Sequence, residues 1–259
     1  MSRKIKILIQ LDRVNWFSDT FIKYYLKFFN KNELFFLLET RFLSEENLIS
    51  YLKTKNFLDE EINIIPLHNT PLPIIERRDH VTNLINNLQK ELLKDGSVLM
   101  NPDVDELIYH PNLRELLETF DSPYLLPSPI DVIHNREKEG DLNFETPIFG
   151  QRNFYLSHRS KTAGWYYKPI IIKDGIKWEV GRHTEDRNVT PGLHLIHIGK
   201  VDYNFVEFLN GENLSMYENQ NINQNGYTEE ELKNWFDVHF KDLLPIPSDV
   251  LNSLRSLEI

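Results

Sequence analysis

Three acidic residues near the middle of the chain have the spacing of a metal site. Asp103 and Asp105 are separated by one residue and followed by Glu106, shortly after the apolar run Val98–Met100. On extended backbone, Asp103 and Asp105 would share a face, because alternate side chains point to the same side. Mg²⁺ and Mn²⁺ commonly bind one or two carboxylates together with substrate phosphates. The spacing therefore predicts a divalent-cation site. The alternative is a solvated acidic turn, since aspartate and asparagine also favour turns.

The segments before this motif alternate between strand and helix patterns. Apolar runs of strand length alternate with segments whose apolar residues recur at helical spacing. The expected elements are strands at 5–11, 33–39, 62–67 and 98–100, with helices at 16–29, 44–53 and 79–92. This order favours parallel βαβ units in a doubly wound α/β sheet. Ligands of such sheets bind outside the carboxyl ends of the strands, where Asp103 and Asp105 are expected.

The pattern changes after Glu106 to short apolar runs divided by turns. An Asp-Gly pair at 174–175 predicts a hairpin, and mixed or antiparallel strands are expected around it. The expected elements are a helix at 111–120, strands at 124–126, 130–133, 144–155, 170–172, 176–180 and 193–198, a loop at 210–227, a helix at 228–240 and a short last helix. We expect one domain over 1–259, divided at about 106 and 210, with a helical tail at 211–259.

Composition narrows the class of protein. The net charge of −10 over 259 residues argues against nucleic acid as a partner, because non-specific binding needs a basic face. The absence of cysteine excludes disulfides and thiolate chemistry and suits a reducing compartment. No apolar run approaches the roughly 20 residues of a membrane span. The expectation is a cytoplasmic protein without an integral membrane segment.

The acidic motif in this context resembles the GT-A glycosyltransferases, most closely the family 2-like group. That group commonly has an apolar run followed by D-x-D-E, then Lys-Pro, Gly-x-His and apolar-x-His elements. The matching segments here are Val98–Met100 with Asp103-Val104-Asp105-Glu106, Lys168-Pro169, Gly181-Arg182-His183 and Leu195-Ile196-His197. The resemblance covers about residues 5–210. One departure is Asn101-Pro102, which stands where the apolar run usually continues to the first aspartate.

The resemblance implies a GT-A-like fold, with a Rossmann-like nucleotide-sugar-binding half at about 1–106 and an acceptor and metal half at about 107–210. It implies a hexosyltransferase-type enzyme that moves a sugar from a UDP- or GDP-sugar to a hydroxyl of a saccharide or glycoconjugate. Mn²⁺ or Mg²⁺ would be held by Asp105 and Asp103 and would neutralise the diphosphate leaving group. His197 or His183 would complete the metal shell, with His194 as a third candidate. A histidine on a strand also commonly has only a structural role.

An inverting transferase further needs a general base near the acceptor hydroxyl. The resemblance favours Glu185 and Asp186 by their distance along the chain from the D-x-D motif, and Asp131 and Glu179 are rivals. A charged surface turn is the alternative explanation for residues 185–186. A retaining reaction would not need this base, so the stereochemistry stays open.

The nucleotide is expected at residues that follow the first strands. Asp12, Arg13 and Glu39 are placed to meet the base and ribose, and Asp103 is a second ribose candidate. Arg78 would reach the phosphates, since arginine suits bidentate phosphate contacts. Two other functions stay open. A nucleotidyltransferase would be favoured by a glycine-rich loop, which residues 12–16 lack. A non-catalytic nucleotide- or carbohydrate-binding protein is the other.

Overall fold

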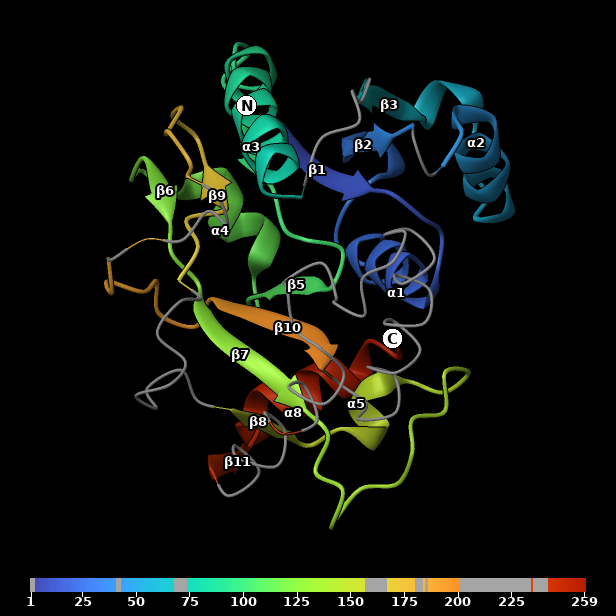
Figure 1. The fold of residues 1–259 in the computed structure, drawn as a ribbon. Helices are drawn as coiled ribbons and strands as arrows, with labels where there is room; N and C mark the ends of the chain where they lie inside the picture. The colour runs from blue at the N-terminus through green and yellow to red at the C-terminus, as the bar shows by residue number, and fades with distance from the viewer. Residues whose placement is uncertain are drawn as a thin grey trace. The chain divides into compact units, whose positions relative to one another are not determined.

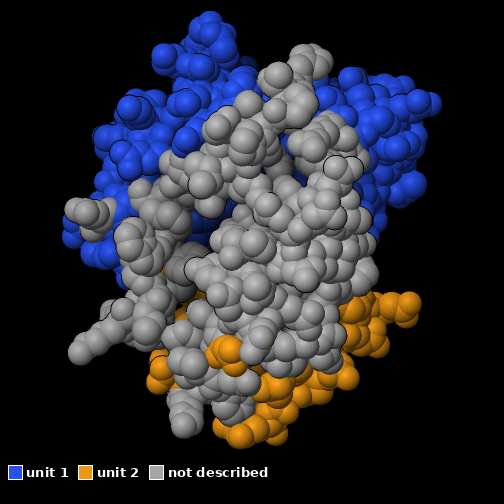
Figure 2. All heavy atoms as spheres, viewed as in Figure 1, with its two compact units in different colours: residues 1–128, 165–195 blue, residues 129–164, 196–259 orange. Residues whose placement is uncertain are grey.

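The chain has an α/β fold with two mixed sheets (Figure 1). The computed structural model describes residues 3–40, 43–67, 74–156, 167–179, 184, 186–200, 234 and 242–259, with the side chains of 74–78 and 200 left out. The chain divides into two compact units, coloured separately in Figure 2. Unit 1 comprises residues 1–128 and 165–195, and unit 2 comprises residues 129–164 and 196–259.

The sheet of unit 1 is built on four parallel strands, which confirms the predicted βαβ pattern. Strand β1 (Ile5–Leu11) pairs in parallel with β2 (Leu34–Glu39) and β4 (Val98–Met100), and β2 pairs with β3 (Asn63–Leu67). Two short antiparallel strands, β9 (Ile171–Ile172) and β6 (Tyr124–Leu125), extend the sheet beyond β4. The strand order is β3-β2-β1-β4-β9-β6. β1 and β2 are apolar almost throughout because strands covered on both faces need apolar side chains on both.

Two helices of unit 1 have a recognisable signal at one end: α1 (Trp16–Tyr25) at its start and α3 (Ile74–Leu92) just beyond its end. In α1 (Trp16–Tyr25), the Asn15 side chain accepts hydrogen bonds from the backbone N–H groups of Phe17 and Ser18. Helix α3 is followed by Gly96, whose φ of 74° is a conformation that glycine adopts at little cost. The remaining elements are α2 (Glu45–Thr54), α3 (Ile74–Leu92), α4 (Leu113–Thr119), β5 (Glu106–Tyr109), β6 (Tyr124–Leu125), β9 (Ile171–Ile172) and the 3₁₀ turns Lys31–Glu33 and Asp59–Glu61.

Helix α3 covers part of the sheet and forms a buried core with it. Val81 and Ile85 pack in one apolar cluster with Leu8 of β1, Leu37 of β2 and Leu99 of β4. Each such side chain contributes about 1.5–3 kcal/mol when fully buried. α3 starts before the predicted residue 79, within a segment whose sequence shows less helical periodicity.

The predicted hairpin at residues 173–176 is wrong. Strand β9 is followed by residues 176–179, which form no strand and instead lie along α3. The side-chain carbonyl oxygens of Gln89 and Asn86 accept hydrogen bonds from the backbone N–H groups of Ile176 (3.0 Å) and Trp178 (2.9 Å), and Asn86 Nδ2 donates to the Trp178 carbonyl oxygen (2.8 Å). Two amide side chains of α3 thus replace the backbone hydrogen-bond partners that a neighbouring strand would have provided.

The described strands of unit 2 are β11 (Leu243–Pro245), β8 (Phe154–Leu156), β7 (Ser128–Ile133) and β10 (His194–Lys200), in this order in the sheet. β8 pairs antiparallel with both of its neighbours, which confirms the expected strand type. The predicted run at 144–155 is wrong in its first part. Residues there form a helical turn after Pro147, and the Gln151 side chain closes that turn by bonding to both backbone groups of Asn143. The elements are β7 (Ser128–Ile133), α5 (Ile148–Gln151), β8 (Phe154–Leu156), β10 (His194–Lys200), β11 (Leu243–Pro245) and α8 (Ser248–Ser256).

The predicted loop at 210–227 lies outside the described residues, as does the helix predicted at 228–240 apart from Asn234. In the described part of the chain, no helix combines the length and the apolar character required to span a membrane.

Candidate functional site

Asn101 fixes the chain where it leaves β4. Its backbone N–H donates to the carbonyl oxygen of Ile170 (2.8 Å), and its side-chain Nδ2 donates to the carbonyl oxygen of Leu8 in β1 (2.7 Å). The side chain is buried, so these bonds satisfy polar groups that water does not reach. The Asn-Pro departure from the apolar run therefore has a structural reason: Asn101 links the end of β4 to both flanking segments.

The acidic motif itself is a tight turn rather than the end of a strand. The backbone N–H of Glu106 donates to the carbonyl oxygen of Asp103 (3.0 Å), and the Glu106 Oε2 atom accepts a hydrogen bond from the Asp103 backbone N–H (2.8 Å). The prediction of extended backbone through Asp105 is therefore wrong, and strand alternation does not place the two aspartates on one face. Asp103 and Asp105 nevertheless remain together, both half-buried, in one turn after β4.

Lys168 provides the counter-charge for this turn. Its Nζ atom donates to Asp103 Oδ2 at 2.8 Å and also contacts Glu106 Oε1. The side chains of Lys168 and Glu106 are 8% and 2% exposed, whereas that of Asp103 is 42% exposed. The Lys-Pro element of the sequence includes Lys168 but assigns it no charge role. The sequence signal for this role is a lysine directly before a proline and three isoleucines, which places a charged residue beside an apolar run.

Two tyrosines of α1 bond to the backbone of β5, which begins at Glu106, the last residue of the turn. The Tyr25 hydroxyl donates to the carbonyl oxygen of Glu106 (3.2 Å) and accepts from the backbone N–H of Ile108 (3.1 Å). The Tyr24 hydroxyl donates to the carbonyl oxygen of Ile108 (2.8 Å). Burial raises the pKa of both tyrosines well above the usual value, so they remain neutral donors.

We expect Tyr25→Phe to lower the free energy of unfolding by about 1–3 kcal/mol, because it leaves buried backbone groups of β5 without their partner. Urea denaturation measures this loss. Tyr51→Phe is the matched control: Tyr51 bonds to Asp19, whose side chain is 48% exposed, so water can replace the bond. Equal losses in the two variants would contradict a specific role for Tyr25.

The carboxyl ends of β1, β2 and β4 lie at one edge of the sheet because these strands are parallel. Asp12 and Arg13 follow β1 and form an ion pair with each other (Nε to Oδ1, 3.2 Å). Glu39 ends β2, is fully buried, and accepts a hydrogen bond from Gln10 Nε2 at 3.3 Å. The strand order reverses between β1 and β4, and such a switch point is where open α/β sheets bind ligands. The Arg78 side chain lies outside the described residues.

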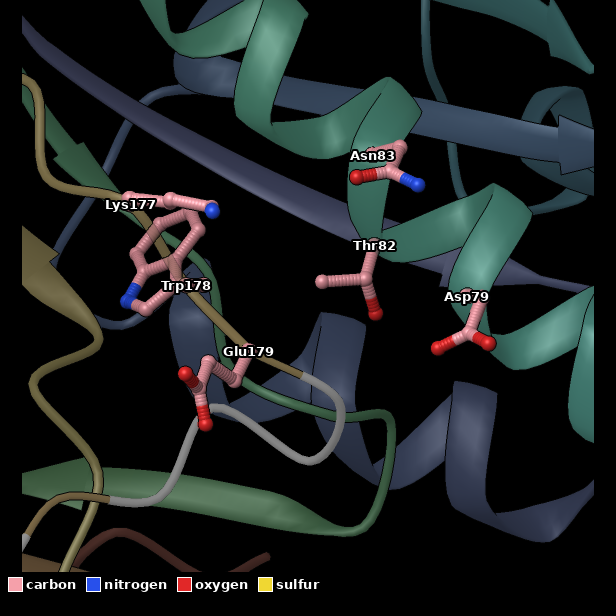
Figure 3. A pocket seen from close by; sticks show the side chains of 6 residues that line it. All are labelled: Asp79, Thr82, Asn83, Lys177, Trp178 and Glu179. Atoms are coloured by element: carbon pink, nitrogen blue, oxygen red, sulfur yellow. The ribbon is translucent and has the colours of Figure 1, made fainter.

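A polar cleft of about 370 Å³ lies between α3 and the segment that follows β9 (Figure 3). Asp79, Thr82 and Asn83 line it from α3, and Trp178 and Glu179, together with Lys177, line the facing wall. The Trp178 indole N–H donates to the carbonyl oxygen of Pro169 (3.0 Å), directly after Lys168. This bond connects the wall of the cleft to the Lys168-Pro169 segment, whose lysine pairs with Asp103 of the acidic turn.

Asp131 and His197 form a pair in unit 2. Asp131 Oδ1 lies 2.7 Å from His197 Nδ1, and the Asp131 side chain is 1% exposed. The two residues come from β7 and β10, which are neighbours in the sheet. The sequence predicts Asp131 as a candidate base and His197 as a candidate metal ligand, but it does not predict that the two side chains meet.

Asp186 belongs to a turn in unit 1. Its Oδ1 atom accepts from the backbone N–H (2.9 Å) and side-chain Nδ2 (2.8 Å) of Asn188, and its Oδ2 atom accepts from the Tyr124 hydroxyl (2.8 Å). The Asn188 backbone N–H, followed by the Tyr124 hydroxyl, holds the pKa of Asp186 below its usual value. These bonds make Asp186 a weaker base. Glu185 and His183 lie outside the described residues.

We expect Tyr124→Phe to raise the pKa of Asp186 toward the usual aspartate value of about 3.9, because the ionised carboxylate loses a donor. A carbon-13 NMR titration of the carboxyl group measures the shift. Asn188→Ala removes only a side-chain donor and keeps the stronger backbone bond, so it is expected to have the smaller effect. An unchanged pKa in Tyr124→Phe would show that the hydroxyl does not stabilise the carboxylate.

The acidic turn has the donor chemistry of a Mg²⁺ or Mn²⁺ site. Such ions use one or two carboxylates and take their other ligands from water and substrate phosphates. The carboxylates of Asp103 and Asp105 therefore match the type and number of protein ligands that these ions use. Among the residues described, no three side chains of histidine, aspartate or glutamate gather closely enough to hold a metal without such additional ligands.

No protein-family model matches the chain, and a search of curated proteins gave no significant match. We therefore infer its function from the residues of the acidic turn, the cleft and the Asp131–His197 pair.

Proposed function

We propose that this protein is a metal-dependent glycosyltransferase of the GT-A type that transfers a sugar from a nucleotide-sugar to an acceptor hydroxyl. The observation that carries the proposal is the placement of an acidic turn at the switch point between β1 and β4. Carboxylates at that position can bind a nucleotide diphosphate through a divalent cation, although the protein is acidic overall.

In this proposal, Asp105 and Asp103 hold the cation, which neutralises charge on the diphosphate leaving group when bound. Asp12 and Arg13, after β1, contact the nucleoside or its phosphates from the neighbouring strand. Glu39 is buried and bonded to Gln10, so its proposed contribution is to shape this edge of the sheet.

The cleft beside α3 is the proposed position for sugar hydroxyl groups of the donor. Asp79, Thr82, Asn83 and Glu179 offer carboxylate, hydroxyl and amide groups, which are the partners that hydroxyl groups need. Trp178 is buried and therefore forms part of the wall rather than a stacking surface.

The pair in unit 2 changes the role that we propose for Asp131. A buried carboxylate that contacts Nδ1 of a histidine fixes the ring and its tautomer, as in histidines that bind metals or act as bases. Asp131 is then a positioning residue, and His197 is the group that receives a proton. Asp186, whose pKa is lowered, is the weaker candidate for the base.

Calorimetric titration with UDP-sugars and GDP-sugars, with and without Mn²⁺, tests the proposal. We expect binding that requires the metal, and slow Mn²⁺-dependent hydrolysis of the bound donor. Binding without hydrolysis or transfer would favour the non-catalytic binding protein. Absence of binding to every donor would reject the glycosyltransferase.

A further inference from the structure

We propose that Lys168 is a built-in competitor for the metal at the acidic turn: its ammonium group occupies Asp103, and a divalent cation binds by displacing it from that carboxylate. The inference rests on the proposed function only in taking the acidic turn as the metal site. It concerns the cation alone and needs no nucleotide-sugar.

The two contacts of Lys168 differ in their exposure. Glu106 is almost completely buried, and an ionised carboxylate there needs a positive partner, because burying an unpaired charge is strongly unfavourable. Lys168 is itself buried and stays near Glu106 for the same reason. Glu106 is also bonded to the Asp103 backbone N–H, which ties it into the turn.

The contact with Asp103 is different because that side chain is 42% exposed. Water and ions can reach this carboxylate, and its ion pair with Lys168 is therefore the exchangeable one. A metal ion that takes Asp103 as a ligand must replace the ammonium group and tolerate its positive charge nearby. Lys168 is thus expected to weaken the binding of a divalent cation to the protein alone.

A donor diphosphate offsets this weakening of cation binding. Its anionic oxygens provide ligands for the metal and a new negative partner for the displaced ammonium group, so the cation and the donor should bind more tightly together than separately. Lys168 is a positioning residue in this scheme: it sets the metal affinity of Asp103 through charge.

The test measures Mn²⁺ binding without nucleotide, from the electron paramagnetic resonance signal of the free ion. Glu106→Gln is compared with the double variant Lys168→Met/Glu106→Gln, so that the pair differs by the ammonium group and neither leaves a buried glutamate charge. We expect the double variant to bind Mn²⁺ at least about tenfold more tightly, a difference equivalent to about 1.4 kcal/mol. Adding Asp103→Asn to both should abolish this difference.

Equal affinity in the first two proteins, or a difference that persists with Asp103→Asn, would overturn the inference. Lys168→Arg keeps the charge and offers a bidentate partner to the carboxylates, so it should bind Mn²⁺ no more tightly than the wild type. A tighter-binding Lys168→Arg would also contradict the inference, whether or not the double variant folds. The Mn²⁺ measurement contains no donor. A protein that failed to bind nucleotide-sugars would therefore contradict the proposed function, whereas the inference about Lys168 is decided by Mn²⁺ binding alone.

Discussion

Lys168→Met is expected to lower the free energy of unfolding by about 3–5 kcal/mol, the loss typical of breaking a buried ion pair on one side. The variant leaves Glu106, which is 2% exposed, without the positive charge that balances it. It also removes the contacts of the Lys168 ammonium group with Asp103 and Glu106 in the turn after β4. Urea denaturation at neutral pH, with the midpoint and slope compared with those of the wild type, measures this change.

Two variants show whether the loss comes from the unpaired charge. Lys168→Met/Glu106→Gln removes both charges and should recover much of the stability that the single variant loses. Lys177→Met changes an exposed lysine later in the same segment and should stay within about 0.5 kcal/mol of the wild type. A single Lys168→Met variant as stable as the wild type would show that Glu106 needs no ionic partner.

Asp105→Asn is expected to lower metal-dependent turnover of the donor by about 100-fold or more. A bound metal ion stabilises transition-state charge by several kcal/mol, and each 1.4 kcal/mol corresponds to a tenfold change in rate. Asparagine keeps the size of the side chain and also favours turns, so the fold should persist. The assay is Mn²⁺-dependent release of UDP or GDP from nucleotide-sugars, with and without saccharide acceptors.

Asp174→Asn provides the matched control, because it removes an exposed carboxylate from a turn of the same unit. It should leave both turnover and Mn²⁺ binding unchanged. If Asp105→Asn retained full activity at low Mn²⁺ concentration, Asp105 would not be a metal ligand, and the acidic turn would then have a purely structural role.

The parallel half of the fold was predictable because its signals are local. The runs at Ile5–Leu11 and Leu34–Glu39 are apolar at nearly every position, which marks strands buried on both faces. The helix that follows β3 shows its apolar spacing at Val81 and Ile85, the residues that pack on the sheet. Such patterns extend over neighbouring residues, so the sequence order reveals them directly.

The parts that were missed depend on partners far away in the chain. The Asp-Gly hairpin prediction failed because the side chains of Gln89 and Asn86 bind the backbone that a second strand would have used. They lie 87 and 92 positions before the residues that they bind. The acidic motif was predicted as a candidate site, but its charge balance depends on Lys168, which lies 62 positions after Glu106. Local sequence patterns do not indicate which distant side chain binds a given backbone group or carboxylate.

The bonds that hold the acidic turn have a consequence for its local stability. Asn101 reaches a residue 93 positions away, Tyr25 one 81 positions away and Lys168 one 62 positions away. A peptide containing only the turn and its flanking strands would therefore lack every one of these anchors. Fluctuations that expose the turn must separate it from β1, α1 and the Lys168 segment together, so its backbone amides should exchange with solvent as one cooperative group. We therefore expect the turn to be stable only within the folded unit, and not in an isolated peptide of the same residues.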